Sequence, residues 1–291
     1  MPTVTRVTTL ALALSFAACK SAPETRAEVK PPELPRQELL VVSQTLTDVT
    51  VKLTGELLGG DEALAIDAAE VEFVVDGTVL STKRAPLSLR LTAGQSAPFE
   101  FEESFTYVKS ADDLKAMDAR GGSLLIALRG NLIGTVQREV EVNGKAEVQA
   151  VAVELPFARS REVRTPRLPH LKLGEAEAGR FAKNEVNAVF HLHVVNPNPF
   201  PITLSSITYR VTMAGKMVAE GEQGVGIKTA VSATDVFDVS ASMTEATHGK
   251  EVEKLIKGLV VPYELQGELK TALYSEPLSA KGEFKLKASK E

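Results

Sequence analysis

The chain has 291 residues, which is enough for two domains of about 100 to 150 residues each. Its 44% hydrophobic and 24% charged residues are an ordinary globular composition and exclude extensive disorder. The net charge of −5 disfavours nucleic acid as a partner, and the single cysteine, Cys19, excludes a disulfide framework and a thiolate metal cage.

Residues 1–18 have the pattern of a processing signal. Arg6 is followed by an apolar run from Leu10 to Leu14 and then by small residues before Cys19. The run is shorter than the roughly 20 apolar residues that span a bilayer. The sequence therefore predicts a cleaved signal peptide over residues 1–18.

The end of this segment, Phe16-Ala17-Ala18-Cys19, resembles the lipobox of bacterial lipoproteins, in which cleavage before the cysteine frees it to carry acyl chains. Acylation of Cys19, with palmitate among the chains, would anchor the protein on a membrane. Lys20 stands where the inner-membrane retention signal has aspartate, so we expect the outer membrane or cell envelope, with the folded part in the periplasm or at the cell surface. The alternative is an ordinary secretory signal in which Cys19 has no role.

Residues 19–36 form a predicted tether. Prolines lie there among charged residues, at Pro23, Pro31, Pro32 and Pro35. This composition cannot bury an apolar core and favours extended polyproline II structure. We expect a spacer that separates the folded part from the membrane.

The remaining sequence contains two copies of one pattern. Val71, Phe73 and Val75 align with Ile207, Tyr209 and Val211 at a shift of 136 residues, and both sets alternate as strands do. Further blocks follow in the same order, at similar shifts: Asp76-Gly77 on Ala214-Gly215, Leu114 and Met117 on Val252 and Leu255, Leu124–Leu132 on Val261–Leu269, and Lys145–Val148 on Lys281–Phe284. A tandem duplication is the simplest explanation.

Within each copy the predicted strands are short and are divided by Gly, Pro and Asn, which favours antiparallel pairing over a parallel α/β sheet. The predicted fold class is mainly β, with two tandem Greek-key antiparallel β-sandwiches that each carry one short helix, at residues 110–120 and 245–257. The predicted sandwiches cover residues 37–157 and 170–291. Residues 158–169, rich in Arg and Pro, are the predicted linker.

The most distinctive stretch lies at residues 188–202. Apolar residues alternate up to Val194, and Asn196-Pro197-Asn198-Pro199 then ends the strand. Proline has no N–H, and asparagine side chains can bond nearby backbone groups. The sequence predicts a rigid corner rather than a ligand site at the two asparagines.

This stretch resembles the Water stress and Hypersensitive response (WHy) domain of type 2 late embryogenesis abundant proteins. The residues that carry the resemblance are Asn196, Pro197, Asn198, Phe200, Tyr209 and Gly215. The first copy has Gly59-Gly60-Asp61-Glu62 in place of the corner, so it reaches the family only through the repeat. The resemblance implies sandwiches like those of immunoglobulin and fibronectin type III domains and an association with desiccation or related stress.

His191 and His193 form a possible metal pair, since alternate residues of a strand lie on one face about 7 Å apart. No Cys, Asp or Glu is placed nearby in the sequence to complete a site. We therefore predict two solvent-facing polar residues, and no metal, cofactor or catalytic residue. Likewise, residues 159–167 could meet anionic head groups, although a polar linker is the simpler interpretation.

These patterns predict a non-catalytic, membrane-anchored envelope lipoprotein. It would act in desiccation or stress tolerance, or in envelope integrity, through contacts with envelope proteins or lipids. The alternative is a periplasmic carrier of a lipid or small apolar ligand, which requires a cavity between the sheets. An enzyme would need polar residues that converge in a pocket, and no catalytic motif marks one.

Overall fold

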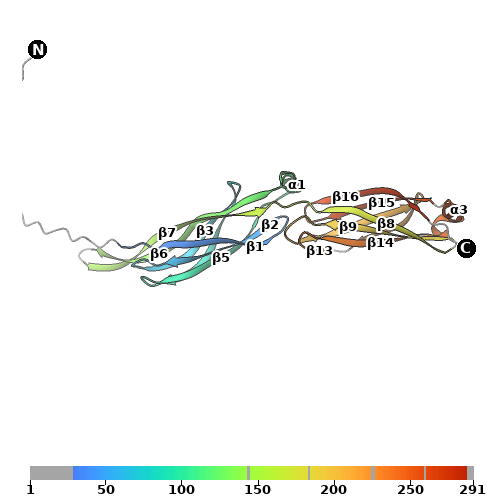
Figure 1. The fold of residues 1–291 in the computed structure, drawn as a ribbon. Coiled ribbons are helices and arrows are strands. Elements are labelled where there is room, and N and C mark those ends of the chain that lie inside the picture. The colour runs from blue at the N-terminus through green and yellow to red at the C-terminus, as the bar shows by residue number, and fades with distance from the viewer. Residues whose placement is uncertain (1–28, 143–144, 183, 224–226, 259, 287–291) are drawn as a thin grey trace, which may run out of the picture.

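The computed structural model describes residues 29–142, 145–182, 184–223, 227–258 and 260–286. Two β-sandwiches follow one another along the molecule (Figure 1). The predicted signal peptide and Cys19 lie outside the described residues. Among the residues described, no helix is long and apolar enough to cross a membrane.

The first sandwich has two antiparallel sheets, ordered β1-β2-β5 and β4-β3-β6-β7. Its strands are β1 (Glu33–Gln44), β2 (Asp48–Leu58), β3 (Ala63–Val75), β4 (Thr78–Leu91), β5 (Ser96–Thr106), β6 (Ser123–Val142) and β7 (Lys145–Arg164). Helix α1 (Ala111–Arg120) connects β5 to β6. Because β5 returns to pair with β2 after the β3–β4 hairpin, the connections form a Greek key.

The second sandwich has main sheets ordered β14-β9-β8 and β12-β11-β15-β16, and a small sheet pairs β10 with β13. Its strands are β8 (His170–Ala182), β9 (Glu185–Val195), β10 (Ile202–Leu204), β11 (Ser206–Met213), β12 (Lys216–Gln223), β13 (Ile227–Thr229), β14 (Thr234–Met243), β15 (Val260–Lys270) and β16 (Ser275–Lys285). Two short helices, α2 (Glu245–His248) and α3 (Glu251–Lys257), connect β14 to β15.

The main sheets of the two sandwiches have the same strand order. The sheet β1-β2-β5 corresponds to β8-β9-β14, and β4-β3-β6-β7 corresponds to β12-β11-β15-β16. The predicted fold class, mainly β with antiparallel sandwiches, is confirmed. The second copy differs in having two helices, because Gly249 adopts a positive φ of 61° and ends the first of them.

Each core is built from the inward faces of the alternating strands. In β9, buried and half-exposed residues alternate along the whole strand. Phe73 stacks on Phe105 in the first sandwich, with ring centroids 4.5 Å apart. Phe190 makes T-shaped contacts with Tyr263 and Phe284 in the second, with ring centroids 5.2 and 5.6 Å apart. These aromatic pairs join the two sheets of each sandwich.

The register of the strands corrects the sequence alignment of the copies. Val71 pairs with Gly130, and Tyr209 pairs with Gly267, so Tyr209 corresponds to Val71 and not to Phe73. The counterpart of Phe73 is Val211, at the shift of 138 residues that also aligns the turns. A slip of two residues keeps every side chain on the same face of a strand, so alternation alone could not exclude it.

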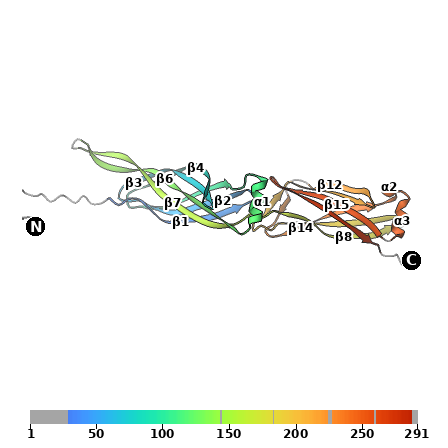
Figure 2. The same cartoon turned by 90° about the horizontal axis from the view of Figure 1, so that it is seen from above.

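The last aligned block is wrong for a different reason. Leu124 pairs with Val163, and Val261 pairs with Phe284, so Val163 and not Val148 is the counterpart of Phe284. Strands β6 and β7 have 20 residues each, against 11 in β15 and β16. The longer hairpin extends beyond the body of the first sandwich (Figure 2). Lys145–Val148 lie in this extension. They are similar in residue type to Lys281–Phe284 of β16, but they do not occupy the equivalent position in the sandwich.

Two predicted boundaries also change. Strand β1 begins at Glu33, so residues 33–36 belong to the first sandwich and not to the tether. Strand β7 continues to Arg164, so only residues 165–169 connect the sandwiches, instead of 158–169. Charged residues on an edge strand can face solvent, so the arginines did not exclude a strand there.

Candidate functional site

Asn196 lies at the end of β9 with only 1% of its surface exposed. Its Nδ2 donates to the carbonyls of Phe200 and Ala230 at 2.9 and 2.8 Å. Its Oδ1 accepts from the backbone N–H and the Nδ2 of Asn198 at 3.0 and 2.9 Å. The amide is thereby fully occupied by the chain around it, as a buried polar group requires.

Asn198 is fully buried and bonds a different segment. Its Oδ1 accepts from the backbone N–H of Arg167 at 2.7 Å, and its Nδ2 donates to the Arg167 carbonyl at 2.9 Å. Pro197 lies between the two asparagines and is exposed. A residue without an N–H suits that position because it leaves no donor to satisfy.

The other residues of the family motif lie apart from this pair. Phe200 is buried after the corner. Tyr209 lies over Gly221 of β12, where an added Cβ would come within 2.5 Å of its hydroxyl oxygen. Gly215 forms the β11–β12 turn with Ala214, and both have positive φ. The structure thus brings Asn196, Asn198 and Phe200 together, whereas Tyr209 and Gly215 belong to the neighbouring hairpin.

The corner of the first sandwich is built from glycine. The N–H of Gly59 donates to the Gln95 carbonyl at 2.7 Å, as the N–H of Asn196 does to Ala233 at 2.9 Å. The carbonyl of Gly60 accepts from the N–H of Gly94, in the way that the Asn198 carbonyl accepts from Ser232. Gly59 and Gly60 therefore take the places of Asn196 and Asn198.

The histidine pair does not converge on one point. His191 Nδ1 lies 2.6 Å from Asp238 Oδ1 on β14, and the ring of His193 lies against Gly174 on β8. Strands β14 and β8 are on opposite sides of β9, so the two rings lean apart. In the described part of the chain no group of three or more His, Cys, Asp or Glu residues could hold a metal. The sequence could not identify Asp238 as the partner of His191, because the two residues are 47 positions apart and become neighbours only when β14 pairs with β9.

Three arginines of residues 159–167, Arg159, Arg161 and Arg167, bond groups within the molecule. Arg159 and Arg161 on β7 donate to the carbonyls of Gln37 and Leu39 on β1, at 2.9 and 3.2 Å. These bonds connect the neighbouring edges of the two sheets. Arg167 Nε instead donates to Asp118 Oδ1 of α1 at 2.6 Å. The basic segment thus closes the first sandwich and connects it to the second.

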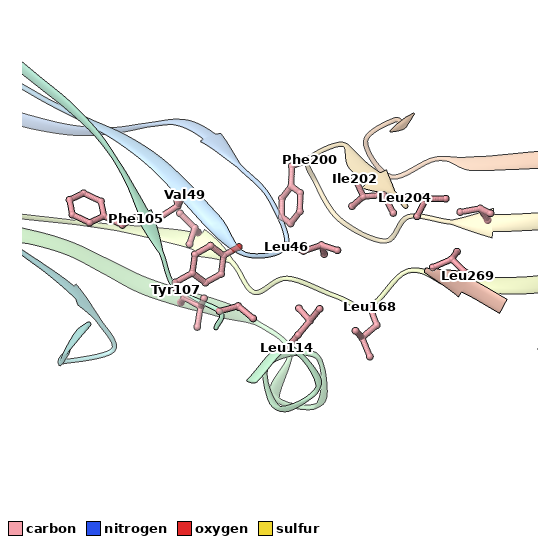
Figure 3. Packing of buried hydrophobic residues seen from close by; sticks show 14 of the residues in the cluster. Leu46, Val49, Phe105, Tyr107, Leu114, Leu168, Phe200, Ile202, Leu204 and Leu269 are labelled. Carbon is pink, nitrogen blue, oxygen red and sulfur yellow. The ribbon is translucent and has the colours of Figure 1, made fainter. Parts of the chain in front are cut away.

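The junction between the sandwiches also has an apolar part. Leu46, Leu114 and Leu168 are buried, and Figure 3 shows them where the two sandwiches meet, near Tyr107 of the first sandwich and Phe200 of the second. The Tyr107 hydroxyl donates to the Thr45 carbonyl at 2.5 Å, and burial raises the pKa of Tyr107. Helix α1 holds Leu114 in place because the Ser110 side chain caps its first turn, accepting from the N–H of Asp113 at 3.1 Å.

Two surface grooves flank this junction, with volumes of about 240 and 520 Å³, and Pro201 lines both. Their lining comes from turns, from short or terminal parts of strands and, in the smaller groove, from Leu114 of helix α1. Neither groove therefore opens between the two sheets of a sandwich.

Residues 191–275 match the family described as late embryogenesis abundant protein. A search of curated proteins gives no match. A protein from Arabidopsis thaliana, solved in solution, is 17% identical, with 41% of this chain and 83% of that chain covered and a TM-score of 0.33.

Two crystal structures are also similar. A protein from Archaeoglobus fulgidus is 16% identical, with 41% of this chain and all of that chain covered and a TM-score of 0.30. A beta-glucuronidase from Bacteroides uniformis is 10% identical, with 81% and 26% covered and a TM-score of 0.29. The family match lies wholly within the second sandwich, from β9 to the start of β16, and includes the asparagine corner.

Proposed function

We propose that this protein is a non-catalytic envelope lipoprotein that acts in desiccation or stress tolerance, or in envelope integrity, with two WHy-like domains held at a membrane by acyl chains on Cys19. The observation that carries the proposal is the match of residues 191–275 to the late embryogenesis abundant family. The equal strand order of the two sandwiches supports extending the assignment to the first of them.

The chemistry of the corner supports a non-catalytic role. The side-chain amides of Asn196 and Asn198 are hydrogen-bonded to backbone groups and to each other. His191 is paired with Asp238. A reacting group needs access to substrate, and the buried asparagines have none.

The interiors of the sandwiches favour this role over that of a lipid carrier. A carrier needs open space between its sheets, large enough for an apolar ligand. The inner faces of both sandwiches instead contribute aliphatic and aromatic side chains to a buried cluster, in which Phe73, Phe105 and Phe190 are below 2% exposed. Contacts with other molecules would therefore be made on the outer faces and strand edges.

The proposal is tested by drying cells that lack the gene. We expect survival to fall below that of the parent strain and to return with the full chain. A Cys19→Ser chain should restore survival less well, because it remains folded but has no site for acyl chains. Labelled palmitate should enter the full chain and not the variant, which would show that Cys19 carries the acyl chains and that the variant lacks the anchor.

Two results would contradict the proposal. Equal survival of the deleted and parent strains would remove the stress assignment. Equal palmitate labelling of the full chain and the Cys19→Ser variant would remove the anchor.

A further inference from the structure

The same contact precedes both sandwiches. Three residues before β1, the N–H of Lys30 donates to Asp61 Oδ2 at 2.8 Å, and the Lys30 carbonyl accepts from the N–H of Asp61 at 3.1 Å. Three residues before β8, the N–H and carbonyl of Arg167 make the corresponding pair of bonds with the side-chain amide of Asn198. In each case one residue of the corner bonds both polar groups of one incoming residue.

The two corners reach this contact with different groups. In the second sandwich a side-chain amide acts as a second peptide group, donating and accepting at once. In the first, the donor is the backbone of Asp61 and the acceptor is its carboxylate. Gly60 allows the close approach, because a Cβ there would lie 1.9 Å from the Lys30 carbonyl oxygen. The docking of the incoming chain is thus a shared feature of the two corners and does not depend on asparagine.

In the second sandwich the docked residue is also held from the other side. Asp118 of the first sandwich accepts from Arg167 Nε at 2.6 Å and from the N–H of Leu168 at 3.2 Å. Thr165 adds bonds to the carbonyls of Gly121 and Gly122, at 3.0 and 3.1 Å. The first sandwich therefore holds the side chain of Arg167, while the second holds its main chain.

These contacts restrict the motion of one sandwich relative to the other. Domains joined by a short connection move relative to one another unless their interface is large or specifically held. Here the connection has only residues 165–169 outside strands, and Leu168 within it is 8% exposed. Polar bonds and apolar burial fix the same few residues.

We propose that the corner of each sandwich is a docking site for the main chain of the segment that enters it, and that Asn198 and Asp118 together lock the two sandwiches into one rigid body. In the first sandwich the same device fixes the chain at Lys30, so the tether ends there rather than at residue 36. This inference concerns the joint alone and does not depend on the proposed function.

The test measures the distance between the sandwiches by pulsed electron paramagnetic resonance. Since Cys19 is the only cysteine, a Cys19→Ser full chain can take two spin labels through Glu102→Cys on β5 and Ser240→Cys on β14, both exposed. We expect one narrow distance distribution. The further substitutions Asp118→Ala and Asn198→Ala should each broaden it, whereas Asp112→Ala on α1 and Asn131→Ala on β6 should leave it unchanged.

Asp118→Ala is the decisive variant, because it removes a joint contact from the first sandwich and leaves the Asn198 pair intact. Circular dichroism should show unchanged strand content for this variant. A broad distribution in the labelled parent would overturn the proposal. So would a distribution that stays narrow in Asp118→Ala.

Discussion

At the scale of the residue, Asn196 shows how a short polar side chain can end a strand inside a core. Its amide replaces water for the carbonyls of Phe200 and Ala230, which the turn leaves without strand partners. Truncation would remove the donor to the buried Phe200 carbonyl and the acceptor of the buried N–H of Asn198. Buried groups that lose a partner are costly because no water reaches them.

We therefore predict that Asn196→Ala lowers the free energy of unfolding by about 1 to 3 kcal/mol. Urea denaturation followed by circular dichroism measures the change. Asn131→Ala is the matched control. Asn131 lies in the first sandwich, where its Nδ2 makes only a long, exposed hydrogen bond of 3.4 Å to Glu154. Equal unfolding curves for Asn196→Ala and the parent would show that the amide contributes nothing to the corner.

Asp76 is the residue whose titration should affect stability. Its ion pair with Arg120 lowers the pKa of the Asp76 carboxyl below the ordinary value of 3.8. Burial opposes this effect, and a hydrogen bond from the N–H of Leu125 at 3.0 Å adds to it. A carboxylate with a lowered folded pKa stabilises the fold fully above its unfolded pKa. That contribution is lost as the pH falls through the folded pKa.

The prediction is that Asp76→Asn is less stable than the parent at neutral pH and that the difference narrows in acid. Unfolding free energies measured across this pH range for both proteins give the difference directly. Asp112→Asn, at a side chain that is 95% exposed, should show no such trend. A difference between Asp76→Asn and the parent that does not change with pH would contradict the assigned ion pair.

At the scale of the element, alternation and turn residues predicted more of the fold than of the corner. The strands around Asp76-Gly77 and Ala214-Gly215 are where the sequence places them, since positive φ at both positions of a tight hairpin leaves few choices. The partners of Asn198 could not be predicted in the same way. Arg167 lies 31 residues earlier in the chain, and the contact exists only after β8 has paired with β9.

The same limit explains the errors in strand β7. Its arginines indicated a linker because composition does not show which face of a strand a residue occupies. In the structure the side chains of Arg159 and Arg161 donate to backbone carbonyls of β1. Val163 of the same strand belongs to the core and is 9% exposed. A charge-rich strand at the edge of a sandwich is thus easily mistaken for a connection.

At the scale of the whole molecule, two sandwiches with one strand order in their main sheets differ at their corners, in their helices and in the length of their hairpins. The corner of the second sandwich uses a buried asparagine pair, and that of the first uses glycine and Asp61. The family match covers only the second. Strand β2 pairs with β5 in the same unbroken way as β9 pairs with β14, so equivalent residues of these strands can be compared position by position.

Two cross-strand pairs occupy equivalent positions and show this most plainly. Thr50 on β2 lies opposite Ser104 on β5, with their hydroxyl oxygens 2.8 Å apart. Asn187 on β9 lies opposite Ser242 on β14, and the Ser242 hydroxyl donates to the Asn187 side chain. Directly opposite residues of an antiparallel pair have Cβ atoms about 4.5 to 5.5 Å apart, which is close to the separation that a disulfide spans.

Disulfide trapping in the Cys19→Ser chain is the most direct test that the two halves share one fold and register. After mild oxidation, mass spectrometry of the native protein should detect a closed disulfide for Thr50→Cys with Ser104→Cys, and equally for Asn187→Cys with Ser242→Cys. The shifted pairs, Thr50→Cys with Glu103→Cys and Asn187→Cys with Ala241→Cys, should stay reduced because their side chains point to opposite faces. Closure in one sandwich but not in the other, or closure of a shifted pair, would contradict the claim.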